Sequence, residues 1–290
     1  MKHIPVLVKE VYNNLPENLG VFLDGTVWHW GHTNYVINNT STNGLFIVGV
    51  DKDPNMVSYV SEKIKPEYKN SFFRKGSYAD LESITKEAWV TWFDAVLLDL
   101  WINMEHVKSK ERGFSMKEEA YLDMRYDENS ELTAFDVVNS FSINYLTWIF
   151  EKFWDIPEDF ARKISEAIAK QRNLKKIKTT KQLVDLFNSL GMGYKKISVL
   201  FQCIRIEVNN ELGELEEFLE KFWSYLNKNW RCLIITYHSI EDRMVKNYFR
   251  SLSKKSNFKL VNKKVIKPTF EEIKKNKASR SAKLRIIENL

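Results

Sequence analysis

Residues 21–51 place two short apolar segments, each followed by an acidic residue, on either side of a loop that contains glycine. Residues 21–23 have the character of a buried strand, and Asp24-Gly25-Thr26 turn sharply out of it. Residues 45–50 form a second apolar strand that ends at Asp51. In a Rossmann-like sheet, a carboxylate at the tip of the second strand accepts hydrogen bonds from ribose hydroxyls. The segment therefore predicts a parallel α/β sheet that binds a nucleoside through Asp51.

Asp51 also has a second interpretation. The sequence Asp51-Lys52-Asp53-Pro54 is a common start of a helix, in which an Asp side chain caps the first turn. The dinucleotide-binding fingerprint GxGxxG does not occur in the chain. This disfavours NAD and favours a cofactor of the S-adenosylmethionine type, which has no pyrophosphate to bind.

Size and composition bound the remaining possibilities. With 290 residues, of which 44% are hydrophobic, the chain can bury one large core or two modest ones. No apolar run approaches the roughly 18 residues that span a bilayer, and the N-terminal apolar stretch is too short for a signal peptide. Cys203 and Cys232 lack the spacing of a zinc site. We therefore expect a cytoplasmic protein with no membrane contact and no metal, in which both cysteines are core thiols.

Positive charge is concentrated at the C-terminal end. Residues 243–290 contain fifteen Lys or Arg and three Glu, whereas the other 242 residues carry a net charge of −6. A basic segment beside an acidic body indicates a polyanionic partner. The alternative is an ordinary solvated surface, since lysine is frequent throughout the chain.

Two further strands are expected to end at the same edge of the sheet. Residues 71–75 lead into a loop that contains Tyr78, and residues 93–100 form an apolar run typical of a strand covered on both faces. The latter strand carries Asp99 to the carboxyl edge, where open α/β sheets bind ligands. Tyr78 follows the strand end that usually flanks an adenine; a partly buried surface tyrosine is the alternative.

The alternation of strands and helices stops near Glu105. Four segments show the three-to-four-residue spacing of amphipathic helices: residues 133–139, 143–153, 158–172 and 180–190. The sheet pattern then resumes with a helix over residues 211–226 and a strand over 232–237. We predict a sheet domain of residues 1–104 and 205–290, with an all-helical domain of residues 105–204 inserted into it.

Further helices and a loop are expected near the N- and C-termini of the sheet domain. The spacing of apolar residues predicts a helix over residues 3–15. Near the C-terminus we expect a helix over residues 245–252, with Ser239 as its cap, followed by a mobile polar loop over residues 254–264.

A series of short motifs runs in order through nearly the whole chain. The series is HIPVLVKEV from His3, VGVDKDP from Val48, LLDL from Leu97, ERGFS from Glu111, LDMRY from Leu122, TAFDVVN from Thr133, FARKI from Phe160, FQCIRIEVNNELGELE from Phe201, ITYHSIEDRMVK from Ile235 and RSAKLRI from Arg280. Together these motifs resemble the ribosomal RNA small subunit methyltransferase H family, also called MraW. The resemblance implies a Rossmann-like S-adenosylmethionine-dependent methyltransferase sheet with an inserted all-helical domain. It also implies methylation of the N4 amine of a cytidine in the decoding region of 16S ribosomal RNA.

Matching positions imply the residues of the site. Those expected to bind S-adenosylmethionine are Trp30, Gly31, His32, Asp51, Tyr78, Asp99 and His106. Methyl transfer to an exocyclic amine needs in-line positioning and an acceptor for the amine hydrogens, and we assign Asp99 and Asn103 as acceptors.

The target base has to leave its stack and be held between side chains. Trp101 or Tyr237 offers a stacking face, and His238 is expected to contact the base or a phosphate. The alternatives are a packing role for Trp101 and, for His238, a strand-end histidine bonded to the backbone.

The resemblance implies 16S ribosomal RNA within the small ribosomal subunit as partner. Two basic clusters are expected to contact its phosphates, and the contacts should weaken steeply with salt. Their members are Arg162, Lys163, Arg172, Lys175 and Lys176 in the helical domain, and Lys263, Lys264, Lys267, Arg280, Lys283 and Arg285 near the C-terminus. Whether the protein is a monomer or a homodimer does not follow from the sequence.

Three stretches depart from the family pattern. Trp28-His29-Trp30 replaces a glycine-rich loop, so that two indoles either narrow the methionine pocket or swing outward to cover it. Beyond Leu100, His106 stands where the family has a glutamine, and residues 196–200 replace a His-Pro-Ala-Thr stretch. Two other functions therefore stay open: a catalytically silent relative that binds RNA or ribosomal subunits, and a methyltransferase for a different substrate.

Overall fold

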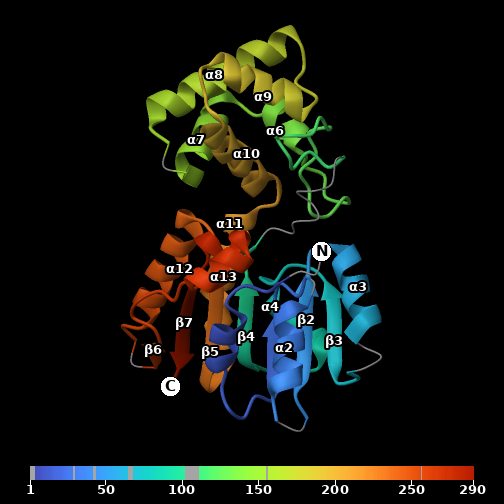
Figure 1. Ribbon diagram of the computed structural model, residues 1–290, viewed down its shortest axis with the longest axis vertical. Helices are drawn as coiled ribbons and strands as arrows, with labels where there is room; N and C mark the ends of the chain where they lie inside the picture. Colours follow the sequence, from blue (N-terminus) through green and yellow to red (C-terminus); the bar gives the residue numbers. More distant parts are fainter. Residues whose placement is uncertain are drawn as a thin grey trace. The chain divides into compact units, whose positions relative to one another are not determined.

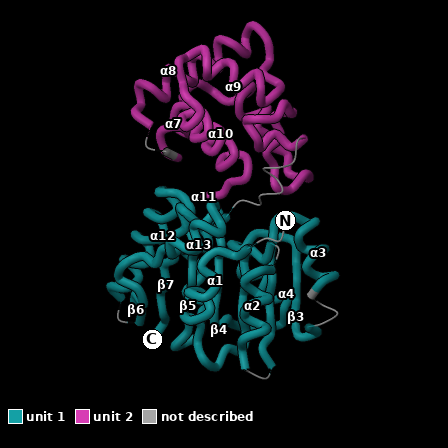
Figure 2. The backbone as a smooth tube through the Cα atoms, viewed as in Figure 1, with its two compact units in different colours: residues 1–101, 213–290 teal, residues 102–212 magenta. Residues whose placement is uncertain are grey.

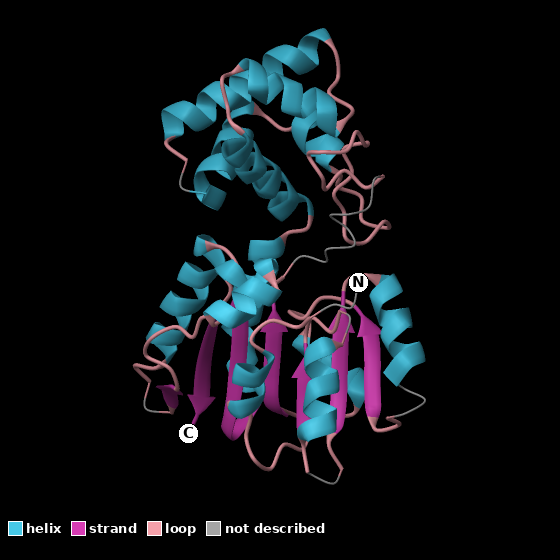
Figure 3. Cartoon of the chain, viewed as in Figure 1, coloured by secondary structure: helices cyan, strands magenta, loops and turns pink. Residues whose placement is uncertain are grey.

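A computed structural model describes residues 4–28, 30–41, 44–64, 68–101, 111–154, 156–255 and 257–290. The chain divides into two units, one of residues 1–101 with 213–290 and the other of residues 102–212 (Figure 2). The first unit contains the sheet and the second is helical (Figure 3).

A seven-stranded sheet forms the centre of the first unit (Figure 1). Its strands are β1 (Val21–Asp24), β2 (Phe46–Asp51), β3 (Ser71–Lys75), β4 (Phe93–Asp99), β5 (Leu226–Thr236), β6 (Phe258–Leu260) and β7 (Lys283–Asn289). The order is β3-β2-β1-β4-β5-β7-β6; strands β1 to β5 run parallel, and β7 is antiparallel to both of its neighbours. The chain therefore changes direction across the sheet between β1 and β4, and a ligand is expected outside the carboxyl ends at this switch point.

Helices cover both faces of the sheet. They are α1 (Val8–Asn13), α2 (Gly31–Asn39), α3 (Pro54–Ile64), α4 (Leu81–Ala88), α11 (Glu211–Lys221), α12 (Ser239–Leu252) and α13 (Phe270–Lys275), with 3-10 turns η1 (Phe222–Ser224) and η2 (Lys277–Ser281). One apolar cluster joins the sheet to α4, α11 and α12, and another joins its opposite face to α1 and α2. Strand β4 contributes to both clusters, because successive side chains of a strand point to opposite faces: Val96 and Leu98 belong to the first cluster, and Ala95 and Leu97 belong to the second.

The second unit is built from five helices among the residues that the structure describes. They are α6 (Ala134–Ser140), α7 (Ile143–Trp154), α8 (Glu158–Leu174), α9 (Thr180–Ser189) and α10 (Tyr194–Val208). Capping boxes start α6 and α9: the side chains of Thr133 and Thr179 accept hydrogen bonds from the N–H groups of Asp136 and Gln182. After α10, the buried guanidinium of Arg205 forms a two-point ion pair with Glu211 (2.8 and 2.9 Å), which fixes the turn into α11.

The mixed α/β class and the parallel order of the central strands agree with the prediction, and both cysteines are buried free thiols. In the described part of the chain, we find no helix with both the length and the apolar character to cross a membrane.

Other elements differ from their predicted bounds. The first helix begins only at Val8, because Leu7 has a left-handed backbone (φ 55°) that interrupts the expected helix over residues 3–15. Helix α12 begins at Ser239 rather than at residue 245, and its cap is His238 rather than Ser239. Strand β6 lies inside residues 254–264, where a mobile loop was expected.

Candidate functional site

Three carboxylates end neighbouring parallel strands at the switch point. Asp24 ends β1, Asp51 ends β2 and Asp99 ends β4. Asp24 is buried, and its Oδ2 accepts a hydrogen bond of 2.6 Å from the hydroxyl of Thr33 on α2. Burial raises the pKa of Asp24, and the hydrogen bond from Thr33 opposes this shift. Sequence reasoning had assigned Asp24 only to a turn, although its place after an apolar strand is the same signal that identified the other two.

Asp51 connects β2 to the loop that follows β1. Its Oδ2 accepts a hydrogen bond from the backbone N–H of Trp28 (3.0 Å), and its Oδ1 accepts one from the N–H of Asp53 (2.9 Å). Burial raises the pKa of Asp51 to about 6, against the lowering effect of these two bonds. Asp53, rather than Asp51, accepts from the N–H of Asn55 at the start of α3. The capping role considered for Asp51 is therefore performed by Asp53.

Two tryptophans of the loop after β1 have backbone angles that are typical of glycine. Trp28 and Trp30 have positive φ angles of 30° and 49°, in or near the left-handed region that glycine adopts most easily. Gly31 follows as the first residue of α2, and a Cβ atom there would lie 2.9 Å from the ring of Pro5. The close approach of the N-terminal segment therefore requires glycine at position 31.

Asp99 is held by groups from several elements. Its backbone N–H donates to Oγ1 of Thr26 (2.7 Å), and its Oδ1 accepts a hydrogen bond from the hydroxyl of Tyr237 (2.7 Å). Its Oδ2 lies 3.7 Å from Nδ1 of His32. Burial raises the pKa of Asp99 to about 7, and the bond from Tyr237 opposes the rise. The roles of Thr26 and Tyr237 as partners of Asp99 were not predicted.

His32 is buried, and its ring is oriented by the N-terminal segment. Nε2 lies 2.8 Å from the carbonyl oxygen of Val6, which can only accept, so Nε2 carries the proton. Burial lowers the pKa of His32. The ring is therefore neutral near pH 7, and its unprotonated Nδ1 faces Asp99.

Tyr78 lies in the loop after β3, as predicted, and packs toward the sheet. Its ring contacts Phe218 edge-on with centroids 5.7 Å apart. A Cβ atom at Gly25 would lie 2.9 Å from Cβ of Tyr78 and closer still to Leu98. Glycine is therefore required where the turn after β1 passes this loop.

The remaining predicted catalytic positions fall in two groups. Asn103 and His106 lie outside the described residues. His238 caps α12: its Nδ1 accepts from the N–H of Glu241 (3.4 Å), and its Nε2 lies 2.7 Å from Oε1 of that residue. The bond from the N–H of Glu241 corresponds to the alternative of a strand-end histidine bonded to the backbone, and the contact with Oε1 adds a side-chain partner. Trp101, the other side chain considered for stacking, contacts Tyr237 with ring centroids 4.4 Å apart.

The predicted RNA-binding residues differ in how they are engaged. Lys283 and Arg285 form ion pairs with Asp242 (3.2 and 2.7 Å), so they support β7 against α12. Arg172 and Lys176 donate to the carbonyls of Val138 and Asn139 near the end of α6, and Arg162 lies 3.6 Å from Glu158. The exposed members are Lys163, Lys175, Lys176, Lys263, Lys264, Lys267 and Arg280.

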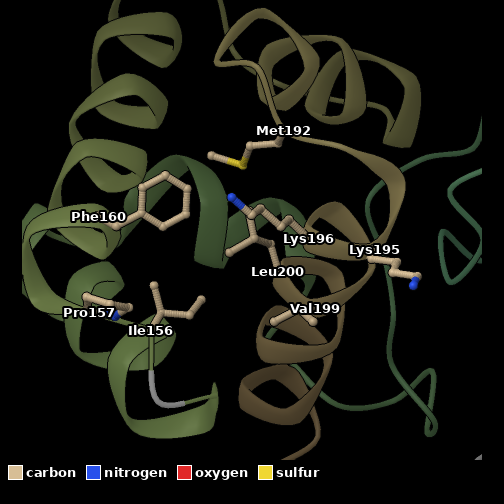
Figure 4. Close-up of a pocket in the computed structure, with 8 residues that line it drawn as sticks. All are labelled: Ile156, Pro157, Phe160, Met192, Lys195, Lys196, Val199 and Leu200. Atoms are coloured by element: carbon tan, nitrogen blue, oxygen red, sulfur yellow. The ribbon is translucent and has the colours of Figure 1, made fainter.

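The helical unit also contains a mostly apolar pocket of about 510 Å³ (Figure 4). Its lining includes Phe160 and Leu200, and the ammonium group of Lys196 lies 5.2 Å from the centre of the Phe160 ring. Residues 196–200, which replace a family motif, therefore contribute directly to this pocket.

Comparisons with known proteins match the chain over its full length. The model of the MraW methylase family matches residues 1–290. The protein named Ribosomal RNA small subunit methyltransferase H from Caldicellulosiruptor saccharolyticus is 37% identical, over 100% of this chain and 99% of its own. Proteins of the same name are 39% identical in Sulfurihydrogenibium sp. and 38% in Elusimicrobium minutum, each over 99% of this chain and 98% of their own. By this match over residues 1–290 and by these identities, the chain belongs to the MraW methylase family.

Proposed function

We propose that the chain is an S-adenosylmethionine-dependent methyltransferase that methylates the N4 amine of a cytidine in the decoding region of 16S ribosomal RNA. The observation that carries the proposal is the position of Asp51 and Asp99 at the carboxyl ends of β2 and β4, on either side of β1, in a chain that belongs to the MraW methylase family. The substrate follows from the relatives, which are named for the small ribosomal subunit. Its place of action is then the cytoplasm, where the subunit is assembled.

The chemistry of the site fits a cofactor that combines a ribose with a positive charge. Among the described residues, the hydrogen-bond partners identified above for Asp24, Asp51 and Asp99 are neutral: hydroxyls and backbone amides, with the imidazole of His32 close to Asp99. Buried carboxylates with neutral partners are stabilised by a cationic ligand. S-adenosylmethionine supplies such a charge in its sulfonium, together with the methyl group to be transferred.

Each predicted residue then has a task. Asp51 accepts hydrogen bonds from the ribose hydroxyls, and Tyr78 lies beside the adenine. Residues 30–32 line the methionine end, where their backbone replaces the glycine-rich loop of the family. Asp99 accepts a hydrogen of the target amine, which makes the nitrogen a better nucleophile and removes its proton after methylation. Asn103 and His106 are proposed to assist from the segment beyond Leu100.

Binding of the ribosomal subunit is assigned to the exposed lysines of both basic clusters. Lys163 and Lys175 belong to the helical unit, and Lys263, Lys264 and Lys267 to the C-terminal segment. Phosphate contacts by such residues release counterions, so the affinity should fall steeply as salt is raised.

The test is methylation of small ribosomal subunits from cells that lack this modification. Labelled S-adenosylmethionine should transfer its methyl group to one cytidine, identified as N4-methylcytidine by mass spectrometry of the nucleosides. Asp99→Asn should abolish transfer while RNA binding remains, and Asp51→Ala should raise the KM for the cofactor. Transfer to another nucleoside, or undiminished turnover by Asp99→Asn, would contradict the proposal.

A second function is favoured by one observation, the positive φ angles and bulky side chains of Trp28 and Trp30. If these indoles fill the methionine pocket, the chain is a silent relative that binds ribosomal subunits without turnover. Calorimetric titration with S-adenosylmethionine distinguishes the two functions. The silent relative predicts subunit binding with no detectable cofactor binding, whereas the methyltransferase predicts both.

A further inference from the structure

The hydroxyl of Tyr237 meets the carboxylate of Asp99 because their strands are neighbours. Tyr237 directly follows β5, and Asp99 is the last residue of β4, where it pairs with Ile235. Parallel strands in this register bring their carboxyl ends together. The phenol then donates a hydrogen bond of 2.7 Å to Oδ1 of Asp99.

Tyr237 is itself fixed on two sides. Its backbone N–H donates to Oε2 of Glu241 (2.9 Å), within the cap of α12. Its ring contacts Trp101 at an interplanar angle of 61°. Burial, together with the neighbouring Asp99, raises the pKa of Tyr237 well above its ordinary value. The phenol therefore stays protonated and acts as a donor at every pH at which the enzyme would be assayed.

The other groups that face Asp99 play different parts. His32 cannot donate to it, because the proton of its neutral ring is on Nε2 at the carbonyl of Val6. The backbone N–H of Trp101 favours the ionised carboxylate, whereas the negative charge of Glu241 opposes it. The negative charge of Asp99 also raises the pKa of Asp24, at the end of β1. Tyr237 thus supplies the side-chain hydrogen bond that supports the charged form of Asp99.

We propose that Tyr237 is a positioning residue for methyl transfer: its hydrogen bond to Oδ1 favours the ionised form of Asp99 and orients the carboxylate so that Oδ2 takes the proton of the target amine. The role rests on the proposed function. In the step, the amine nitrogen bonds to the methyl carbon while the carbon–sulfur bond breaks and leaves its electron pair on sulfur. The nitrogen then loses one proton to Oδ2 of Asp99, and S-adenosylhomocysteine and the methylated cytidine are released.

The test is the pH profile of kcat/KM for the cofactor in Tyr237→Phe. The variant keeps the ring and its contact with Trp101 but loses the donor. The loss of a hydrogen bond to a charged group raises the pKa of that group by about one unit. The rising limb of the profile should therefore move to higher pH by about one unit. The activity should fall about ten-fold on the acidic side of the profile and recover on the alkaline side.

Tyr145→Phe is a matched control in the other unit. Its hydroxyl donates 2.9 Å to Oε1 of Glu207, another carboxyl whose pKa burial raises, so the same kind of bond is removed away from the site. The profile of this variant should coincide with that of the wild type. A deficit in Tyr237→Phe that is equal at every pH would overturn the positioning role and leave the proposed function intact.

A second measurement does not require turnover. The affinity for S-adenosylmethionine should rise with pH as Asp99 ionises, and Tyr237→Phe should move the midpoint of this rise upward by the same amount. An unchanged midpoint in a variant with the melting temperature of the wild type would overturn the proposal. If the wild type binds the cofactor but methylates no subunit, the proposed function fails while this measurement still decides the role of Tyr237.

Discussion

The preference of the site for S-adenosylmethionine over S-adenosylhomocysteine should increase with pH across neutrality. The two ligands differ by one methyl group and by the positive charge that it places on sulfur. Burial raises the pKa of Asp99 to about 7 and that of Asp51 to about 6, so both carboxyls gain protons as the pH falls toward 6. A sulfonium favours the ionised form of a nearby carboxylate, whereas a neutral thioether does not.

The magnitude follows from proton linkage. If the bound sulfonium returns the pKa of Asp99 toward its ordinary 3.8, binding must release the proton that the free site holds below pH 7. Each pH unit below the pKa of the free site then weakens binding about ten-fold. The ratio of the affinity for S-adenosylmethionine to that for S-adenosylhomocysteine should therefore fall about ten-fold when the pH is lowered from alkaline values to one unit below the pKa of Asp99 in the free site.

Calorimetric titration of both ligands over a series of pH values measures this ratio. Asp99→Asn should make the ratio independent of pH, because the variant cannot ionise. Asp51→Asn should weaken both ligands alike, since both carry the same ribose, and should leave the slope of the ratio unchanged. A wild-type ratio that is constant with pH, or one that keeps its slope in Asp99→Asn, would refute the proposal that Asp99 responds to the charge of the sulfonium.

Three further predictions concern stability and RNA binding. Trp89 is the C-cap residue that follows α4; its φ is 56°, and it is 94% exposed. Trp89→Gly should stabilise the fold by about 1 kcal/mol, whereas Trp89→Ala keeps the backbone strain and should not stabilise it; thermal denaturation measures both. Asp242→Asn should destabilise by about 1–2 kcal/mol at neutral pH, because Arg285 and Lys283 hold the pKa of Asp242 low despite its burial. The difference from wild type should shrink as the pH falls below 3.8 and through the lower pKa of the folded state. In subunit-binding titrations, Lys263→Ala should make the fall of log affinity with log salt concentration shallower by about one unit of slope. Lys9→Ala should leave this slope unchanged.

Strand ends were predictable where a strand closes with an apolar run followed by an aspartate, as β1, β2 and β4 do. This pattern predicts the ends at Asp51 and Asp99 from the sequence, and the parallel topology places them at one edge of the sheet. Strand β7 was missed as a strand although its sequence belongs to a family motif. Its burial alternates only partly, and it becomes a strand by pairing with β5.

Contacts within the site were less predictable, because they depend on strand order and register. The bond between Tyr237 and Asp99 joins residues 138 positions apart and follows from β4 and β5 being neighbours. His238 was predicted to contact the base or a phosphate from its position after a strand, and the structure adds a role in which it forms a capping box with Glu241 three residues later. The Glu at this spacing was visible in the sequence, and histidine is simply an uncommon residue at the cap position.

The loss of glycine from the loop after β1 does not by itself imply a loss of cofactor binding. Glycine serves two purposes in such a loop: it permits positive φ angles, and it removes a Cβ atom where the backbone passes close to another group. Here Trp28 and Trp30 take up the positive φ angles at a cost of about 1–2 kcal/mol each. The N–H of Trp28 still reaches Asp51, and glycine is retained at position 31, where Pro5 leaves no room for a Cβ. We therefore expect the cofactor to bind despite the two tryptophans.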